Sequence, residues 1–168
     1  HAIPRRQRQM CIRDSTYVGR VAIEKNIEAF LNLKGDYIKT VVGDGPELQK
    51  YIRKYPEVNF VGLKEGEELA GYYANADVFV FPSKTDTLGN VILEALACGT
   101  PVAAFPVTGP KDILQNSNLN TLDENLNASV KKALKVSRND CRNFALKFKW
   151  DDCTNAVSYT HLTLPTRN

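Results

Sequence analysis

Strand-like and helix-like segments alternate along this chain of 168 residues, and this alternation restricts the possible folds more than any other feature. The apolar segments of strand length are 16–18, 37–42, 58–61, 78–81 and 101–105. The segments with helical spacing of apolar residues are 23–33, 46–54, 67–75, 90–98, 111–114, 123–135 and 138–147. A repeating order of strand, helix and strand predicts right-handed βαβ units. We therefore expect an α/β fold with a doubly wound, parallel, Rossmann-like sheet.

The two ends of the chain differ in composition from the middle. Both histidines, the only methionine and five of the 22 basic residues lie in residues 1–15 and 158–168. Without these flanks 17 basic and 18 acidic residues remain, so the basic character belongs to the ends. Both flanks resemble translated sequencing-adapter sequence, and we expect them to be non-native. The alternative for the first flank is a basic arm that binds nucleic acid or a membrane.

Residues 16–157 are expected to form one domain, with gene-encoded sequence missing upstream of its first strand. No apolar run reaches the ~18 residues of a membrane span, and no signal peptide opens the chain. The cysteines of this region have neither metal-site nor disulfide spacing, so we expect no metal, a cytoplasmic location and a core role for Cys98. Its lack of histidine excludes a Ser-His-Asp or Cys-His centre.

One carboxylate stands out in an otherwise apolar segment. Residues 88–107 are apolar or small almost throughout and contain a single charged residue, Glu94. The helical part, 90–98, is apolar on every face, so we expect a buried helix, in which an unpaired carboxylate is costly. Asp86 lies eight positions earlier in the polar run 83–87. We expect the two carboxylates to hold a polar ligand, although Asp86 alone would more often be a turn or cap residue.

A polar or glycine-rich loop follows each expected strand, and in open α/β sheets ligands bind at this edge. The loops contain Gly19-Arg20, Gly43-Asp44-Gly45-Pro46, Gly62 with Lys64, residues 82–89 and residues 106–110. Arg20 and Lys25 together can neutralise a diphosphate. The alternative is that they are two solvated cations paired with Glu24 or Glu28. The sequence leaves both interpretations open.

Two glycine motifs near these loops are less specific. Leu88-Gly89-Asn90 at a helix start offers backbone N–H groups to a phosphate, although a turn also needs glycine. Residues 43–46 match neither a phosphate loop with Lys-Ser/Thr nor a full G-x-G-x-x-G. We expect these four residues to form a tight turn leading into a helix.

Several of these motifs occur together in one order and spacing. They are Gly19-Arg20 with Lys25, Gly43-Asp44-Gly45-Pro46, Phe60-Val61-Gly62, Asp77-Val78-Phe79-Val80-Phe81-Pro82-Ser83 and Asp86-x7-Glu94. In this combination the chain resembles the C-terminal, donor-binding half of a retaining GT-B glycosyltransferase of family 4. Residues 85–87 and 106–110 are most similar to the branch of α-mannosyltransferases and glycolipid glycosyltransferases.

The resemblance implies roles for particular residues. Glu94 would accept hydrogen bonds from the ribose of a nucleotide-sugar, and Asp86, where most of the family has glutamate, would address the transferred sugar. Arg20 and Lys25 would stabilise the leaving diphosphate. These four residues are the expected catalytic set. The expected donor-binding residues are Gly19, Arg20, Lys25, Gly62, Leu63, Lys64, Pro82, Asp86, Leu88, Gly89, Asn90 and Glu94.

The resemblance also implies a function, namely transfer of a hexose from GDP-mannose or a UDP-sugar to a lipid or glycan. No metal or other cofactor and no nucleic acid is expected. The acceptor would be bound by an N-terminal domain that this chain does not contain, so the chain is expected to be inactive alone. The complete enzyme is expected in the cytoplasm, with possible peripheral binding to the membrane.

Two other interpretations remain open. Nucleotide-sugar 2-epimerases share the two-domain architecture but need further acid and base residues, which the lack of histidine disfavours. The second interpretation is a flavodoxin-like binding or receiver module without catalysis. A receiver needs an acidic cluster after the first strand, where this chain has Gly19-Arg20.

Overall fold

A computed structural model describes residues 12–86, 89–115, 117–119 and 121–148. Its centre is a sheet of five strands in the order β3-β2-β1-β4-β5, and every neighbouring pair is parallel. The strands are β1 (Arg13–Val18), β2 (Tyr37–Val42), β3 (Asn59–Gly62), β4 (Val78–Phe81) and β5 (Val102–Ala104). The prediction of a doubly wound, parallel, Rossmann-like sheet is therefore confirmed. The order differs from the 2-1-3-4-5 order of flavodoxin-like sheets, so that alternative fold is wrong.

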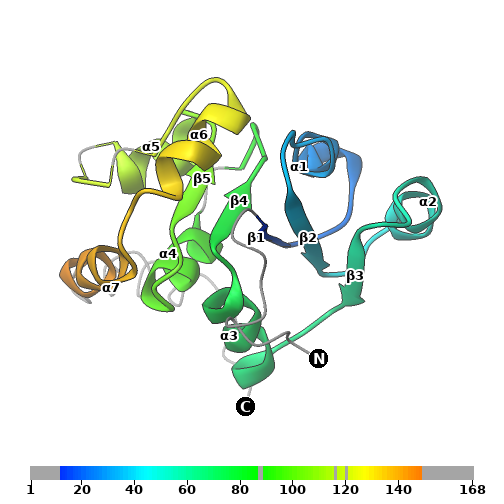
Figure 1. Ribbon diagram of the computed structural model, residues 1–168, viewed down its shortest axis with the longest axis horizontal. Coiled ribbons are helices and arrows are strands. Elements are labelled where there is room, and N and C mark those ends of the chain that lie inside the picture. Colours follow the sequence, from blue (N-terminus) through cyan, green and yellow to red (C-terminus); the bar gives the residue numbers. More distant parts are fainter. Residues whose placement is uncertain (1–11, 87–88, 116, 120, 149–168) are drawn as a thin grey trace, which may run out of the picture.

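Helices connect the strands and cover both faces of the sheet (Figure 1). They are η2 (Ile23–Lys25), α1 (Ile27–Leu31), α2 (Leu48–Lys54), α3 (Gly66–Asn75), α4 (Asn90–Ala97), α5 (Thr108–Leu114), α6 (Leu126–Ala133) and α7 (Arg138–Lys147). In Figure 1, α1 and α6 lie above the sheet, and α3, α4 and α7 lie below it. Among the described residues no helix is long and apolar enough to cross a membrane.

The residues of β4 show how the sheet separates two cores. Val78 and Val80 face the core formed with α1, α2 and α6, whereas Phe79 and Phe81 face the core formed with α3, α4 and α7. Side chains alternate between the faces of a strand, so a strand covered on both faces has to be apolar at every position. All four residues of β4 are buried. The continuous apolar run in the sequence therefore marks the centre of the fold.

The first strand begins earlier than predicted. Arg13, Asp14 and Ser15 belong to β1, where they pair with Tyr37, Ile38 and Lys39 of β2. The folded unit thus includes three residues that the sequence analysis assigned to the first flank. The foreign origin of the flanks stays a prediction, and residues 1–11 and 149–168, with Asp151, Asp152 and Cys153, lie outside the described residues.

The predicted helix 23–33 is interrupted at one residue. Asn26 has φ 54° and ψ 34°, which separates the short η2 from α1. Asparagine tolerates this left-handed conformation better than most residues. The break lies directly after Lys25 and determines where that side chain leaves the backbone. The predicted helix 123–135 is also shorter, and α6 begins only at Leu126 after an Asn125 cap.

Candidate functional site

A pocket of about 490 Å³ opens at the carboxyl ends of β1 and β4. Strand order reverses here, because β2 lies on one side of β1 and β4 on the other. Ligands of open α/β sheets bind at such a switch point. The pocket is lined by Tyr17, Val18, Gly19, Arg20, Glu24, Lys25, Phe81, Ser83, Asp86, Asn90 and Val91. Five residues predicted from the sequence, Gly19, Arg20, Lys25, Asp86 and Asn90, are thus brought together.

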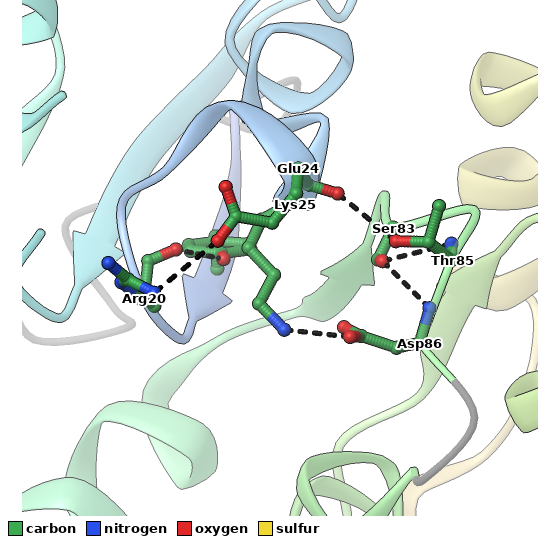
Figure 2. Close-up of polar contacts among 7 residues, drawn as sticks. Arg20, Glu24, Lys25, Ser83, Thr85 and Asp86 are labelled. Atoms are coloured by element: carbon green, nitrogen blue, oxygen red, sulfur yellow. Dashed lines mark hydrogen bonds and ion pairs between the residues drawn. The ribbon is translucent and has the colours of Figure 1, made fainter. Parts of the chain in front are cut away.

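An ion pair spans the pocket. Lys25 Nζ lies 2.7 Å from Asp86 Oδ1, and each side chain is about one-quarter exposed (Figure 2). The lysine follows β1 and the aspartate follows β4, so residues 61 positions apart meet at the switch point. A lysine ammonium has three N–H donors. Lys25 can therefore contact Asp86 and an anionic ligand at the same time.

Two further hydrogen bonds join the same two loops. Asn26 Nδ2 donates to the carbonyl oxygen of Pro82 at 3.0 Å, and Thr85 Oγ1 donates to the carbonyl oxygen of Glu24 at 3.3 Å. Together with the ion pair, these bonds tie the segment 24–26 to the segment 82–86 by three contacts. Sequence reasoning missed Asn26 and Thr85. The only signal for Asn26 was its position directly after Lys25.

Ser83 shapes the turn that carries Asp86. Its buried hydroxyl oxygen accepts hydrogen bonds from the backbone N–H groups of Thr85 at 3.4 Å and Asp86 at 3.3 Å (Figure 2). Serine forms such local turns because its short side chain reaches its own backbone two or three residues on. The turn holds the backbone of Asp86 in the position from which its carboxylate contacts Lys25.

Arg20 is less constrained than Lys25. Its side chain is 63% exposed, and Nη1 lies 3.5 Å from Glu24 Oε1, a long contact of little energetic value. Glu28 pairs instead with Lys54 Nζ at 3.0 Å. The backbone of Arg20 is held firmly, since Tyr17 donates its hydroxyl hydrogen to the Arg20 carbonyl at 2.7 Å. The guanidinium therefore projects from a fixed backbone and is free to reach a ligand.

The loop 43–46, which follows β2, contacts the loop that follows β1 through its backbone. A Cβ atom on Gly43 would lie 1.8 Å from the Gly19 carbonyl oxygen, and one on Gly45 would lie 2.3 Å from the Val21 carbonyl oxygen. Val21 N donates to the Asp44 carbonyl at 2.9 Å. The predicted turn before a helix is therefore present, and its glycines allow two loop backbones to touch.

The helix that carries Glu94 is not apolar on every face. Ile92, Ala95 and Leu96 of α4 are buried, whereas Asn90 and Glu94 are exposed. The expectation of a buried charge in a fully buried helix is wrong, because the small number of polar residues in α4 hid its solvent-facing side. Glu94 nevertheless has a partner: Tyr73 donates its hydroxyl hydrogen to Glu94 Oε2 at 2.9 Å.

Other predicted site residues do not line this pocket. Gly62 is the last residue of β3, which lies two strands away from β1, and Leu63 and Lys64 follow it. Lys64 pairs with Glu68 at 3.1 Å. Pro82 is buried and contributes its carbonyl to Asn26. Leu88 lies outside the described residues.

Gly89 precedes α4 for a reason of packing. A Cβ atom there would lie 2.7 Å from Ile113 Cδ1 and 3.2 Å from Ile92 Cδ1. Side chains therefore fill the space next to this glycine.

Cys98, predicted as a core residue, is only half-buried, whereas Cys141 is buried. Among the described residues no group of three or more His, Cys, Asp or Glu side chains could hold a metal ion.

The family model for glycosyl transferases group 1 matches residues 13–145. The chain belongs to this family. The resemblance to GT-B glycosyltransferases of family 4 is thereby confirmed. A GDP-mannose-dependent alpha-mannosyltransferase from Corynebacterium glutamicum is 40% identical over 108 residues, which are 63% of this chain and 26% of that protein. The chain thus spans about a quarter of the length of this relative.

Solved structures agree with the family. Sucrose-phosphate synthase from Thermosynechococcus elongatus has a TM-score of 0.69 and 26% identity, over 90% of this chain and 45% of that one. Anabaena HepE, solved with UDP and glucose, has a TM-score of 0.67 and 19% identity, over 90% of this chain and 48% of that one. The chain therefore has the fold of about half of each structure.

Proposed function

We propose that this chain is the donor-binding half of a retaining hexosyltransferase, which holds the diphosphate of a nucleotide-sugar in the pocket between β1 and β4. The ion pair between Lys25 and Asp86 carries the proposal. It places a cation for the phosphate next to a carboxylate for sugar hydroxyls, at the switch point where the family fold predicts a ligand. The family membership of residues 13–145 supports the same assignment.

The chemistry follows from charge. Breaking the bond between sugar and phosphate leaves negative charge on the diphosphate, which Lys25 and Arg20 would stabilise. Preformed charges aimed at such an oxygen are worth more in a partly dehydrated pocket than in water. Asp86, held by the Ser83 turn, would accept hydrogen bonds from the transferred sugar and orient it. Arg20 would close on the diphosphate from the pocket rim.

The donor that we favour is GDP-mannose, because the Corynebacterium relative is named for it. A UDP-sugar is the second candidate, since HepE was solved with UDP and glucose. The acceptor would be a lipid or a glycan, bound outside this chain, so the chain would bind a donor without transferring its sugar. A cytoplasmic location and a peripheral contact of the complete enzyme with the membrane belong to the same proposal.

The test is calorimetric titration of the chain with GDP, UDP, guanosine and uridine. Whichever nucleoside diphosphate the chain binds, Lys25→Ala should lower its affinity by about 10-fold or more. The reason is that a hydrogen bond to a charged group contributes about 1.5–3 kcal/mol. Nucleoside binding should not change. Lys50→Ala is the matched control, because Lys50 is exposed on α2, pairs with Glu47 at 3.0 Å and is not among the residues that line the pocket. Equal losses for diphosphate and nucleoside would contradict the proposal.

For Asp86→Asn we expect no loss of affinity for the nucleoside diphosphate, in contrast to Lys25→Ala. Removing this negative charge releases Lys25 for the phosphate, so GDP or UDP should bind equally well or more tightly. The additional affinity of the nucleotide-sugar over the nucleoside diphosphate should fall. An unchanged difference in affinity between the nucleotide-sugar and the nucleoside diphosphate would show that Asp86 does not act on the sugar.

A further inference from the structure

Glu94 lies on the pocket side of α4, although it does not line the pocket itself. Asn90 lines the pocket, and positions i and i+4 of a helix share one face. Glu94 is therefore the next residue along α4 from the pocket wall. Its side chain is exposed, so solvent alone would leave the carboxylate several rotamers. A carboxylate that recognises a ligand has to be held in one of them.

Tyr73 of α3 is the residue that holds it. The ring is 1% exposed and packs edge-on against Phe79 of β4, with ring centroids 5.5 Å apart and an interplanar angle of 67°. The backbone of Tyr73 is fixed as well, because its carbonyl accepts a hydrogen bond from the buried hydroxyl of Thr100. From this fixed position the phenol hydroxyl reaches Glu94 Oε2 at 2.9 Å.

The hydroxyl of Tyr73 can act only as a donor towards this carboxylate. Burial, followed by the negative charge of Glu94, raises the pKa of Tyr73 far above its ordinary value of 10.0. The phenol is therefore protonated at neutral pH. A buried phenol on a ring held by its neighbours thus donates to an exposed carboxylate, and such a contact can orient that carboxylate.

We propose that Tyr73 is a positioning residue that fixes Glu94 for recognition of the ribose hydroxyls of the nucleotide. The inference rests on the proposed function, because it assigns Glu94 to the ribose of the same donor. Binding of the Tyr73 hydroxyl to Oε2 leaves Oε1 and the remaining lone pair of Oε2 to accept two ligand hydroxyls. The contact reduces the rotamer entropy that the ligand would otherwise have to remove.

The test compares ligands with and without ribose hydroxyls. GDP and UDP are titrated in parallel with their 2′,3′-dideoxy analogues into the chain, Tyr73→Phe, Tyr72→Phe and Glu94→Ala. Tyr72→Phe is the matched control, because it removes a phenol hydroxyl from the neighbouring, half-buried position of α3. Tyr73→Phe should lower the affinity for the ribonucleotide about 5- to 10-fold and leave the affinity for the dideoxy analogue unchanged. Glu94→Ala should abolish the preference for ribose.

A second measurement does not depend on nucleotide binding. The free energies of unfolding of Tyr73→Phe, Glu94→Ala and the double variant form a double-mutant cycle, which should show coupling between the two residues. Coupling together with the loss of ribose preference supports the inference. Absence of coupling overturns it.

The remaining outcomes separate the inference from the proposed function. If Glu94→Ala loses the ribose preference while Tyr73→Phe keeps full affinity, the Tyr73 contact is structural only and the inference is overturned. If Glu94→Ala keeps the ribose preference, the ribose role of Glu94 fails and the inference fails with it. If neither nucleotide binds the chain, the proposed function fails for this chain, and the inference with it.

Discussion

At the scale of single residues, the site depends on side chains whose backbones are fixed by contacts between loops. Lys25 is followed by the left-handed Asn26, which donates to Pro82, and Asp86 follows the Ser83 turn. Gly43 allows the loop after β2 to touch the loop after β1 at Gly19. Small residues thus set the distance between the charged groups, although they carry no chemistry of their own.

Replacing Gly43 should therefore be severe. Gly43→Ala places a Cβ atom 1.8 Å from the Gly19 carbonyl at a φ of +143°, so both sterics and backbone conformation oppose it. We expect the free energy of unfolding to fall by about 3 kcal/mol or more, measured by denaturant titration. Gly71→Ala in α3 is the control: nothing lies within 4 Å of its Cβ position, and alanine should stabilise the helix by up to about 1 kcal/mol. Equal effects would show that the two loops can separate freely.

At the scale of elements, each part of the site comes from the end of a strand or the start of a helix. The central strand β1 matters most, because it pairs with β2 over six residues and with β4 at Ser15 and Thr16. Ser15 is fully buried, and the backbone N–H of Asp14 donates to Asp77 Oδ2 at 2.8 Å. The first three residues of β1 are therefore integrated into the sheet.

Truncation tests this integration. Removing residues 1–15 deletes the pairing of Arg13–Ser15 with β2, whereas removing residues 1–11 leaves β1 intact. We expect the melting temperature of the first variant to lie about 5 °C or more below that of the second, by differential scanning calorimetry. Identical melting temperatures would show that the sheet needs only residues 16–18 of its central strand.

At the scale of the whole molecule, two cores separated by one sheet hold several protonated groups. Burial raises the pKa of the Cys141 thiol from 9.0 to about 11, and it raises the pKa of the Tyr17 and Tyr73 hydroxyls above 10.0. In the unfolded chain these groups would lose their protons at lower pH. The contribution of Cys141 to stability is therefore complete below pH 9 and is lost as the pH rises from 9 towards 11, whereas the contribution of the two tyrosines starts to be lost only above pH 10.

The melting temperature should accordingly fall as the pH is raised from 8 to 10.5. Cys141→Ala removes a buried thiol whose pKa is raised from 9.0 to about 11, so the fall between pH 9 and 10.5 should be less steep in this variant than in the unchanged chain. The comparison uses slopes, because the substitution also removes a buried side chain and lowers the melting temperature at every pH. Parallel slopes would show that deprotonation of Cys141 does not limit stability.

The sequence by itself determined the class of fold, because periodicity depends on neighbouring residues only. The bounds of β2, β4 and α7 agree with the prediction, since their apolar pattern or capping residue is local. That Lys25 and Asp86 lie at the same edge of the sheet could also be predicted, because carboxyl ends of parallel strands share one edge, whereas their roles towards a ligand stay predictions. The roles of Gly62, Leu63, Lys64 and Glu94 towards a ligand stay predictions.

Tertiary structure decided what depends on residues distant in the sequence. The solvent-facing side of α4 exists because α7 and the sheet cover only its other side, which no count of apolar residues reveals. Tyr73 meets Glu94 because α3 and α4 pack together, and Asn26 meets Pro82 because β1 and β4 are neighbours. Contacts of this kind are set by strand order and helix packing, and those are properties of the whole chain.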